Sequence, residues 1–114
     1  MGYRSPTMDE ARLLLELARI AGLDDPEGWL RELTVRPMKD GGMGSLDLAA
    51  ATPESARSGL VVPKASVQFA DEDGTQVIAT LNADESGVPM ELDVWKTDFS
   101  RLRRIPSTFR RIED

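Results

Sequence analysis

The hydrophobic periodicity of this chain changes once, and that change constrains its fold most. Up to about Leu33, apolar residues recur every three to four positions, as on an amphipathic helix. Beyond it, they alternate with polar residues at the two-residue period of a half-buried strand. The sequence therefore predicts an α+β domain, with N-terminal helices packed on one face of an antiparallel sheet of about five strands.

The first helix is predicted over residues 8–21. Thr7 and Glu10 have the spacing of a capping box, in which each side chain bonds the other residue's backbone amide. Gly22 can end the helix in the left-handed conformation. One apolar stripe at helical spacing is expected to face the sheet: Leu13, Leu14, Leu17, Ala18 and Ala21.

A second, shorter helix is expected after the first. Asp25 can act as its N-cap, and Pro26 suits its first turn. Trp29, Leu30 and Leu33 supply its buried side.

The remaining elements are predicted from alternation and turn residues. Strands are expected at 33–38, 45–48, 65–69, 75–81 and 88–95, with turns at 40–44, 71–74 and 82–87. A surface loop is expected over 50–63, with a helical turn favoured at 53–56. Pro37 cannot donate a ladder hydrogen bond, so the first strand should lie at an edge or end there. In the last strand, Val88, Met90, Leu92 and Val94 should face the core, opposite Glu91, Asp93 and Trp95.

The composition argues against several kinds of chemistry. The 114 residues suit one domain, and the chain contains neither cysteine nor histidine. This excludes disulfides, thiolate or imidazole metal ligands, and histidine-based catalytic units. We therefore expect no enzymatic activity, cofactor or metal. No signal peptide or membrane-length apolar run is apparent, and with the lack of cysteine this favours a soluble, cytoplasmic protein.

The charge of the chain is unevenly distributed. Residues 1–100 carry nine basic and 18 acidic side chains, a net charge of −9. Residues 101–114 carry five arginines and two acids, a net charge of +3. The acidic body should attract basic proteins and repel nucleic acids. The arginine-rich segment is expected to fold back on that body or stay solvated rather than bind nucleic acid.

Two loops resemble fragments of ligand-binding motifs. The glycine-rich segment 40–45 lacks the spacing of phosphate-binding loops, which favours a structural turn with positive φ angles. Asp71 and Asp73 precede Gly74 as in part of a calcium loop. However, Thr80 stands where that motif requires an acidic ligand, so a solvated hairpin turn is favoured.

Glu91 and Asp93 should project from one face of the last strand, and Asp47 would join them if the second and last strands were neighbours. Such a cluster could perform acid–base chemistry or bind a hard cation, but carboxylates on a solvated sheet face need no such role. Trp95 shares this face. It either forms a contact site for a basic, flat protein partner or is covered by the C-terminal segment.

Two stretches carry a family resemblance. They are RPMKDGGMGSL at residues 36–46 and ELDVWKTDF at residues 91–99, supported by Leu102 and Ile105-Pro106. They resemble a family of small, uncharacterised bacterial domains over most of residues 36–106. In size and charge the chain is also similar to the immunity proteins encoded beside polymorphic toxins. That similarity implies a non-catalytic protein that binds and neutralises a toxin.

The leading hypothesis is thus an immunity protein that contacts a basic toxin domain through Glu91, Asp93, Trp95, Asp71 and Asp73. The first alternative is a small-ligand-binding or regulatory domain with a pocket between helix and sheet. An enzyme that uses the carboxylates and a nucleic-acid-binding protein that uses the arginines come next. A membrane partner is not expected.

Overall fold

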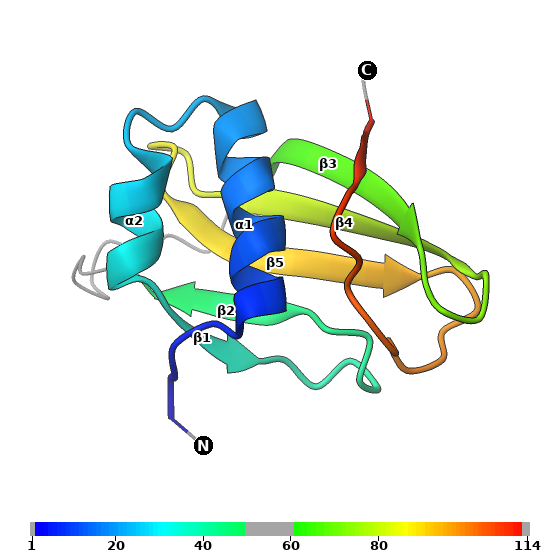
Figure 1. Cartoon of the computed structure of the whole chain (residues 1–114). Coiled ribbons are helices and arrows are strands. Elements are labelled where there is room, and N and C mark those ends of the chain that lie inside the picture. Colours follow the sequence, from blue (N-terminus) through cyan, green and yellow to red (C-terminus); the bar gives the residue numbers. More distant parts are fainter. Residues whose placement is uncertain (1, 50–60, 113–114) are drawn as a thin grey trace.

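The computed structural model describes residues 2–49 and 61–112 of the chain. Two helices and a six-stranded antiparallel sheet make up the α+β fold (Figure 1). The elements are α1 (Met8–Ala21), α2 (Pro26–Glu32), β1 (Thr34–Pro37), β2 (Leu46–Ala49), β3 (Val62–Ala70), β4 (Gln76–Ala83), β5 (Pro89–Lys96) and β6 (Arg110–Arg111). The predicted arrangement of N-terminal helices on one face of the sheet is confirmed.

Helix α1 has the predicted bounds and caps. The Thr7 hydroxyl accepts a hydrogen bond from the Glu10 amide, and the Glu10 carboxylate accepts one from the Thr7 amide. Gly22 ends the helix with a φ of 83°. Leu13, Leu14, Leu17 and Ala18 are buried, so the apolar stripe faces the sheet as predicted.

Helix α2 also forms where the sequence indicates, but it is buried less deeply than expected. The Asp25 carboxylate accepts a hydrogen bond from the Gly28 amide, 3.1 Å away. Trp29 and Leu30 are only half-buried, because α2 lies at the side of α1 and not over the centre of the sheet. Leu33, just after the helix, is buried.

The strands follow the order β1-β2-β5-β4-β3-β6. β1 is an edge strand that ends at Pro37, as the proline predicts, and Arg4 pairs with Val35 along its outer side. β2 lies between β1 and β5, which places Asp47 opposite Glu91. The β3–β4 hairpin continues the sheet beyond β5.

Several strand boundaries differ from the sequence-based expectation. β3 begins at Val62, so the expected loop over 50–63 is too long at its end; residues 50–60, including the favoured helical turn at 53–56, lie outside the described residues. β4 continues to Ala83, which shortens the following turn. The register between β4 and β5 shifts between Asn82 and Ala83, so Pro89 is buried while Val88 and Met90 are only half-buried. β6 was not predicted.

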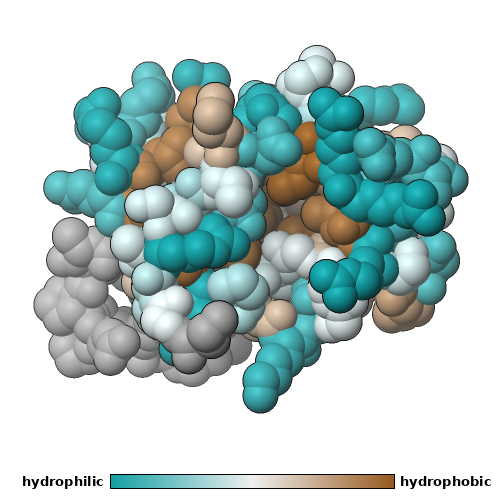
Figure 2. Space-filling view, turned by 60° about the horizontal axis from the view of Figure 1, so that its bottom comes forward, coloured by the Kyte–Doolittle hydropathy of each residue, from teal (hydrophilic) through white to brown (hydrophobic). Residues whose placement is uncertain are grey.

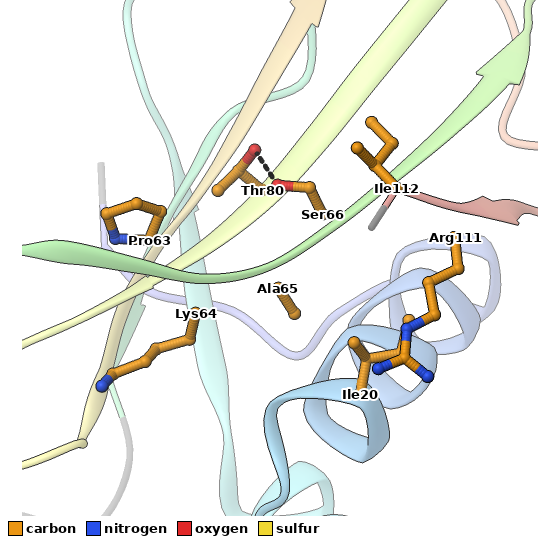
Figure 3. Close-up of a pocket in the computed structure, with 8 residues that line it drawn as sticks. All are labelled: Ile20, Pro63, Lys64, Ala65, Ser66, Thr80, Arg111 and Ile112. Carbon is orange, nitrogen blue, oxygen red and sulfur yellow. Dashed lines mark hydrogen bonds between the residues drawn. The ribbon is translucent and has the colours of Figure 1, made fainter. Parts of the chain in front are cut away.

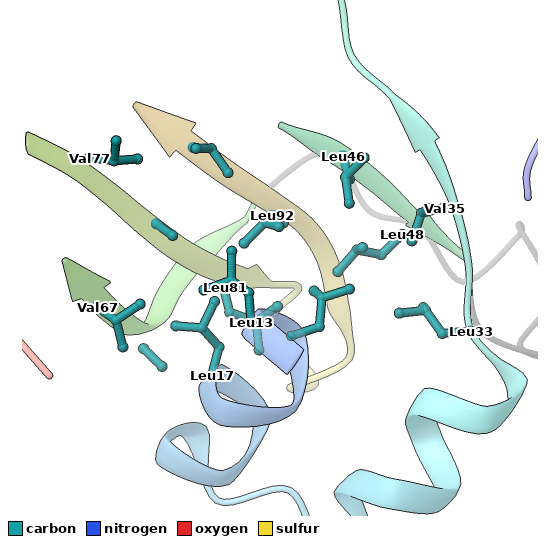
Figure 4. Packing of buried hydrophobic residues seen from close by; sticks show 14 of the residues in the cluster. Leu13, Leu17, Leu33, Val35, Leu46, Leu48, Val67, Val77, Leu81 and Leu92 are labelled. Atoms are coloured by element: carbon teal, nitrogen blue, oxygen red, sulfur yellow. The ribbon is translucent and has the colours of Figure 1, made fainter. Parts of the chain in front are cut away.

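The core lies between α1 and the sheet (Figure 4). Its members alternate along the strands, as the two-residue period requires: Val35, Leu46, Leu48, Ala65, Val67, Phe69, Val77, Ala79, Leu81, Leu92 and Val94. Part of the cover comes from the C-terminal segment, residues 101–112, which runs beside α1 (Figure 1). Arg12 of α1 holds this segment by donating to the Ile105 and Pro106 carbonyls, at 3.1 and 2.8 Å.

The C-terminal segment completes the core with residues whose spacing shows no period. Leu102, Ile105 and Phe109 pack against the buried cluster. The Phe109 ring meets the ring of Phe69 edge-on, with the ring centroids 5.7 Å apart. The sequence prediction left these residues unassigned because an irregular segment carries no periodic signal.

The opposite face of the sheet is not covered by either helix (Figure 1). Figure 2 shows one side of the molecule, where hydrophilic side chains interleave with hydrophobic patches. None of the helices in the described ranges is long and apolar enough to span a bilayer.

Candidate functional site

The uncovered face of β5 displays three of the sequence-predicted site residues. Leu92 and Val94 are buried in the core, so strand alternation points Glu91, Asp93 and Trp95 away from the helices. Asp93 and Trp95 are exposed, and Glu91 is half-buried. We call Glu91, Asp93 and Trp95 the β5 surface.

Asp47 lies next to the β5 surface, as expected if β2 and β5 were neighbours. It lies opposite Glu91 in the register and is paired with Arg36, with Oδ2 3.3 Å from Nη2. The Arg36 guanidinium also stacks over the Tyr3 ring, 4.6 Å from its centroid. Glu91 accepts a hydrogen bond from the Asn82 side chain, at 2.9 Å. Arg36 therefore balances the charge of Asp47, and the Asn82 side chain bonds Glu91.

Asp93 is the third acid on this face of the sheet. It is opposite Thr80 of β4. Partial burial raises the pKa of the Asp93 carboxyl, and the negative charges of Glu91 and Asp40 raise it further. Asp93 is therefore a carboxylate held in a locally negative field, to which an incoming cation would be attracted.

Trp95 is exposed, so it is not covered by the C-terminal segment. Its exposed fraction is 41%, and the C-terminal segment runs on the other face of the sheet. Trp95 lies opposite Ile78 of β4. Its ring is also close to that of Phe99, with centroids 6.3 Å apart and planes inclined by 54°. A large apolar surface therefore stands beside the acids.

Asp71 and Asp73 are not brought to the β5 surface. Asp71 is only 4% exposed, so the expectation of a fully solvated hairpin turn is wrong for this residue. Both carboxylates bind the ammonium group of Lys96, with Nζ–Oδ2 distances of 2.8 Å to Asp71 and 2.7 Å to Asp73. The third Lys96 donor bonds the Arg101 carbonyl at 3.0 Å. All three donors of this fully buried ammonium are thus satisfied.

This Lys96–Asp71–Asp73 cluster also holds the C-terminal segment. Asp71 accepts hydrogen bonds from the Arg103 and Arg104 amides, at 2.8 and 3.0 Å. Burial acts to raise the pKa of Asp71, but these bonds and the one from Lys96 lower it overall. The Lys96 hydrogen bond, helped by the Thr75 amide, lowers the pKa of Asp73 to about 2. The arginine-rich segment therefore folds back on the acidic body, as expected.

Sequence reasoning missed Lys96, although a signal for it exists. Continued alternation from Leu92 and Val94 places residue 96 on the core face, where an ammonium group requires charged partners. The acidic turn at 71–73 supplies them. Phe99 was missed as well, since its exposure depends on the turn that follows β5.

The glycine-rich turn is structural, as predicted. Gly41, Gly42 and Gly44 have φ angles of 75°, 83° and 107°. The Asp40 carboxylate accepts hydrogen bonds from the backbone amides inside the loop, including Ser45 at 2.9 Å. A side chain at Gly44 would also approach Leu102 to 3.0 Å, so glycine permits close packing there.

A hollow of about 550 Å³ lies at the edge of β3 (Figure 3). Arg111 points toward Ile20 of α1, whereas the Ser66 and Thr80 hydroxyls meet on the other side of the strand, 2.9 Å apart. Its polar groups are thus divided between the two faces of the sheet. A small-ligand site would require polar groups that converge on one point, and these do not.

The described residues contain no group of three or more carboxylates placed to hold a metal ion. No curated protein and no solved structure matches the sequence. A family model does match, described as a domain of unknown function (DUF6984), and it covers residues 3–106. The match includes both helices, beyond the stretches that carry the resemblance in the sequence, and the chain therefore belongs to the DUF6984 family.

Proposed function

We propose that this protein is a non-catalytic binding protein, and more specifically an immunity protein that binds and neutralises a basic toxin domain. The observation that carries the proposal is the exposed Trp95 beside Asp93 on a rigid central strand. Aromatic residues that bury large areas at low entropic cost are frequent anchors of protein interfaces. The contact surface is the β5 surface, Glu91, Asp93 and Trp95, whereas Asp71 and Asp73, which bind the buried Lys96, have a structural role.

Electrostatics supports a basic partner. Residues 1–100 carry a net charge of −9, and Asp93 is in a negative local field. Complementary charge accelerates association, and speed is essential for a protein that must intercept a toxin. A cysteine-free chain suits the reducing cytoplasm, where such a toxin would be intercepted.

Rigidity also supports binding by a preformed surface. β5 pairs with β4 along its length and with β2 at Glu91 and Leu92, and the Ser45 hydroxyl bonds the Val94 backbone, so the backbone of the β5 surface is fixed before a partner arrives. A preorganised surface loses little conformational entropy on binding. The same arrangement spreads the acids along an open face, which differs from the enclosed pair of carboxylates with separated pKa values that acid–base catalysis uses.

The test combines capture with a neutralisation assay. Proteins retained by this chain from its host lysate are identified, and each is expressed alone and together with the chain. We expect one basic protein that arrests growth by itself and is neutralised by co-expression. Trp95→Ala and Asp93→Lys should weaken its binding about tenfold or more and abolish the rescue.

Glu32→Lys is the matched control for charge reversal, because Glu32 is an exposed acid in the helix layer. It changes the net charge as Asp93→Lys does but leaves the β5 surface intact. The proposal fails if no retained protein is toxic, or if Glu32→Lys and Asp93→Lys reduce the rescue equally.

A further inference from the structure

The turn after β5 holds an aromatic residue in an unfavourable backbone conformation. Phe99 has a φ of 64° and is the only non-glycine residue with positive φ in the described ranges. Its amide donates to the Lys96 carbonyl at 2.8 Å and closes the turn. A bulky side chain is strained in this left-handed region, where glycine is preferred. The turn itself therefore gives no reason for a phenylalanine.

The core gives no reason either. The exposed fraction of the Phe99 side chain is 69%, so burial does not compensate for the strain. Its ring instead stands 6.3 Å from that of Trp95, inclined by 54°, and both side chains are exposed. Residues kept in strained conformations without a folding benefit are concentrated at functional sites.

Negative charge flanks these two rings. Asp93 precedes Trp95 on the same face of β5, and Asp98 precedes Phe99 in the turn. The Asp98 carboxylate accepts hydrogen bonds from the Ser100 amide and hydroxyl, at 3.0 and 2.7 Å, and these hold its pKa below the usual value. Asp98 is therefore ionised at neutral pH. Aromatic faces between carboxylates favour a cation over a neutral apolar group.

We propose that Trp95 and Phe99 form an aromatic clip that receives an arginine side chain of the basic protein partner, with Asp93 and Asp98 supplying the complementary charge. This inference rests on the proposed binding function and names the group that the surface recognises. A guanidinium is preferred to an ammonium because it is planar, stacks on rings and is less strongly hydrated. Phe99 is kept for recognition at a cost in stability.

The first measurement concerns the strain. Phe99→Gly relieves the left-handed conformation, whereas Phe99→Ala removes the ring but keeps most of the strain. We expect Phe99→Gly to have the higher thermal midpoint of the two variants, by about 4 °C, and no lower a midpoint than the parent. A Phe99→Gly variant that melts below Phe99→Ala would show that the turn is not strained and would remove this support.

The second measurement concerns the ligand. In a Trp29→Phe background, Trp95 is the only tryptophan, so its fluorescence reports binding at the clip. The probes are an oligoarginine and an oligolysine peptide of equal length. We expect tighter binding of oligoarginine, and Phe99→Gly should weaken it about threefold or more without altering the net charge. Equal binding of the two peptides, or an unchanged affinity in Phe99→Gly, would overturn the proposal.

These outcomes are separable from failure of the proposed function. If the clip is absent but the β5 surface binds a toxin, Phe99→Gly will rescue growth as well as the parent while Trp95→Ala will not. If the clip exists but no toxin does, the peptide preference will persist while no retained protein arrests growth.

Discussion

Two pairs of acidic residues differ in whether the fold provides a cation to balance their charge. Asp71 and Asp73 are bound to a buried lysine, and their pKa values are lowered. Glu91 and Asp93 stand on the open face of β5, and the pKa of Asp93 is raised. Both pairs have the same spacing in sequence, two residues apart, but among the described residues only the first pair binds a cation.

The difference separates a structural role from a binding role. The Lys96–Asp71–Asp73 cluster uses its hydrogen-bonding capacity internally and fixes the C-terminal segment over the core. The β5 surface keeps part of its charge and a large ring available to solvent. A charge that the fold does not neutralise remains available to attract a partner. Substitutions in the two regions should therefore affect different properties of the protein.

The largest expected effect is loss of stability on substitution in the buried cluster. Asp71→Asn removes a charge partner of Lys96 and weakens the acceptor for two backbone amides. We expect the free energy of unfolding to fall by about 3 kcal/mol, as when one member of a buried ion pair is removed. Asp93→Asn, the matched change on the open face, should alter it by less than about 1 kcal/mol. Urea unfolding measures both, and equal losses would contradict the distinction.

The pH dependence of stability should distinguish the same two regions. Asp73 has a folded pKa of about 2, below its ordinary value of 3.8. A depressed pKa gives stability that is complete above the unfolded value and is lost as pH falls through the folded value. We expect the parent to lose this contribution between pH 4 and 2, and Asp73→Asn to lack that part of the loss. The check is unfolding of both proteins across this range; parallel curves would be inconsistent with the cluster geometry.

Asp93 should behave in the opposite sense. Its folded pKa lies above the ordinary value of 3.8, so the native state favours the protonated form. Its ionisation therefore lowers stability progressively as pH rises from about 4 through the raised pKa. We expect Asp93→Asn to be more stabilising, relative to the parent, at pH 7 than at pH 3.5. The difference should be below about 1 kcal/mol, because Asp93 is exposed and screened. A larger benefit at low pH would contradict this sign.

A similarly small effect is expected at Arg36, on the other side of the open face. Arg36→Ala removes the pair with Asp47 and the stacking on Tyr3. Partly exposed pairs contribute little, so the free energy of unfolding should fall by about 0.5–1 kcal/mol. A loss as large as that of Asp71→Asn, measured in the same urea series, would show that the two regions do not differ as proposed.

The periodic parts of the fold were predictable from the sequence. The cap at Thr7, the apolar stripe that begins at Leu13 and the alternation through Leu92 and Val94 each fix local structure by residue type and spacing. The sequence predicts that Asp47 lies beside Glu91 if β2 and β5 are neighbours, and in the structure they are. The side of β5 that carries Asp93 and Trp95 follows from alternation alone.

The remaining features depend on contacts between distant segments. The burial of Asp71 requires Lys96 and the amides of residues 103–104, which no local pattern links. Likewise, Leu102 and Phe109 reach the core through an irregular segment. The conformation of Phe99 arises in a turn where glycine is usual, so the residue type pointed away from the observed geometry. Long-range pairing decides the first two features, whereas Phe99 departs from the usual residue preference of its own turn.

The central claim is that the face carrying Trp95 is the binding surface, and hydroxyl-radical footprinting tests it most directly. The protein is oxidised alone and in complex with its captured partner, and side-chain modification is quantified by mass spectrometry. The account predicts protection of Trp95 and Phe99 in the complex, with unchanged oxidation of Met8, which is 87% exposed at the start of α1. Protection of Met8 with Trp95 still fully oxidised would place the partner on the helix layer and contradict the account.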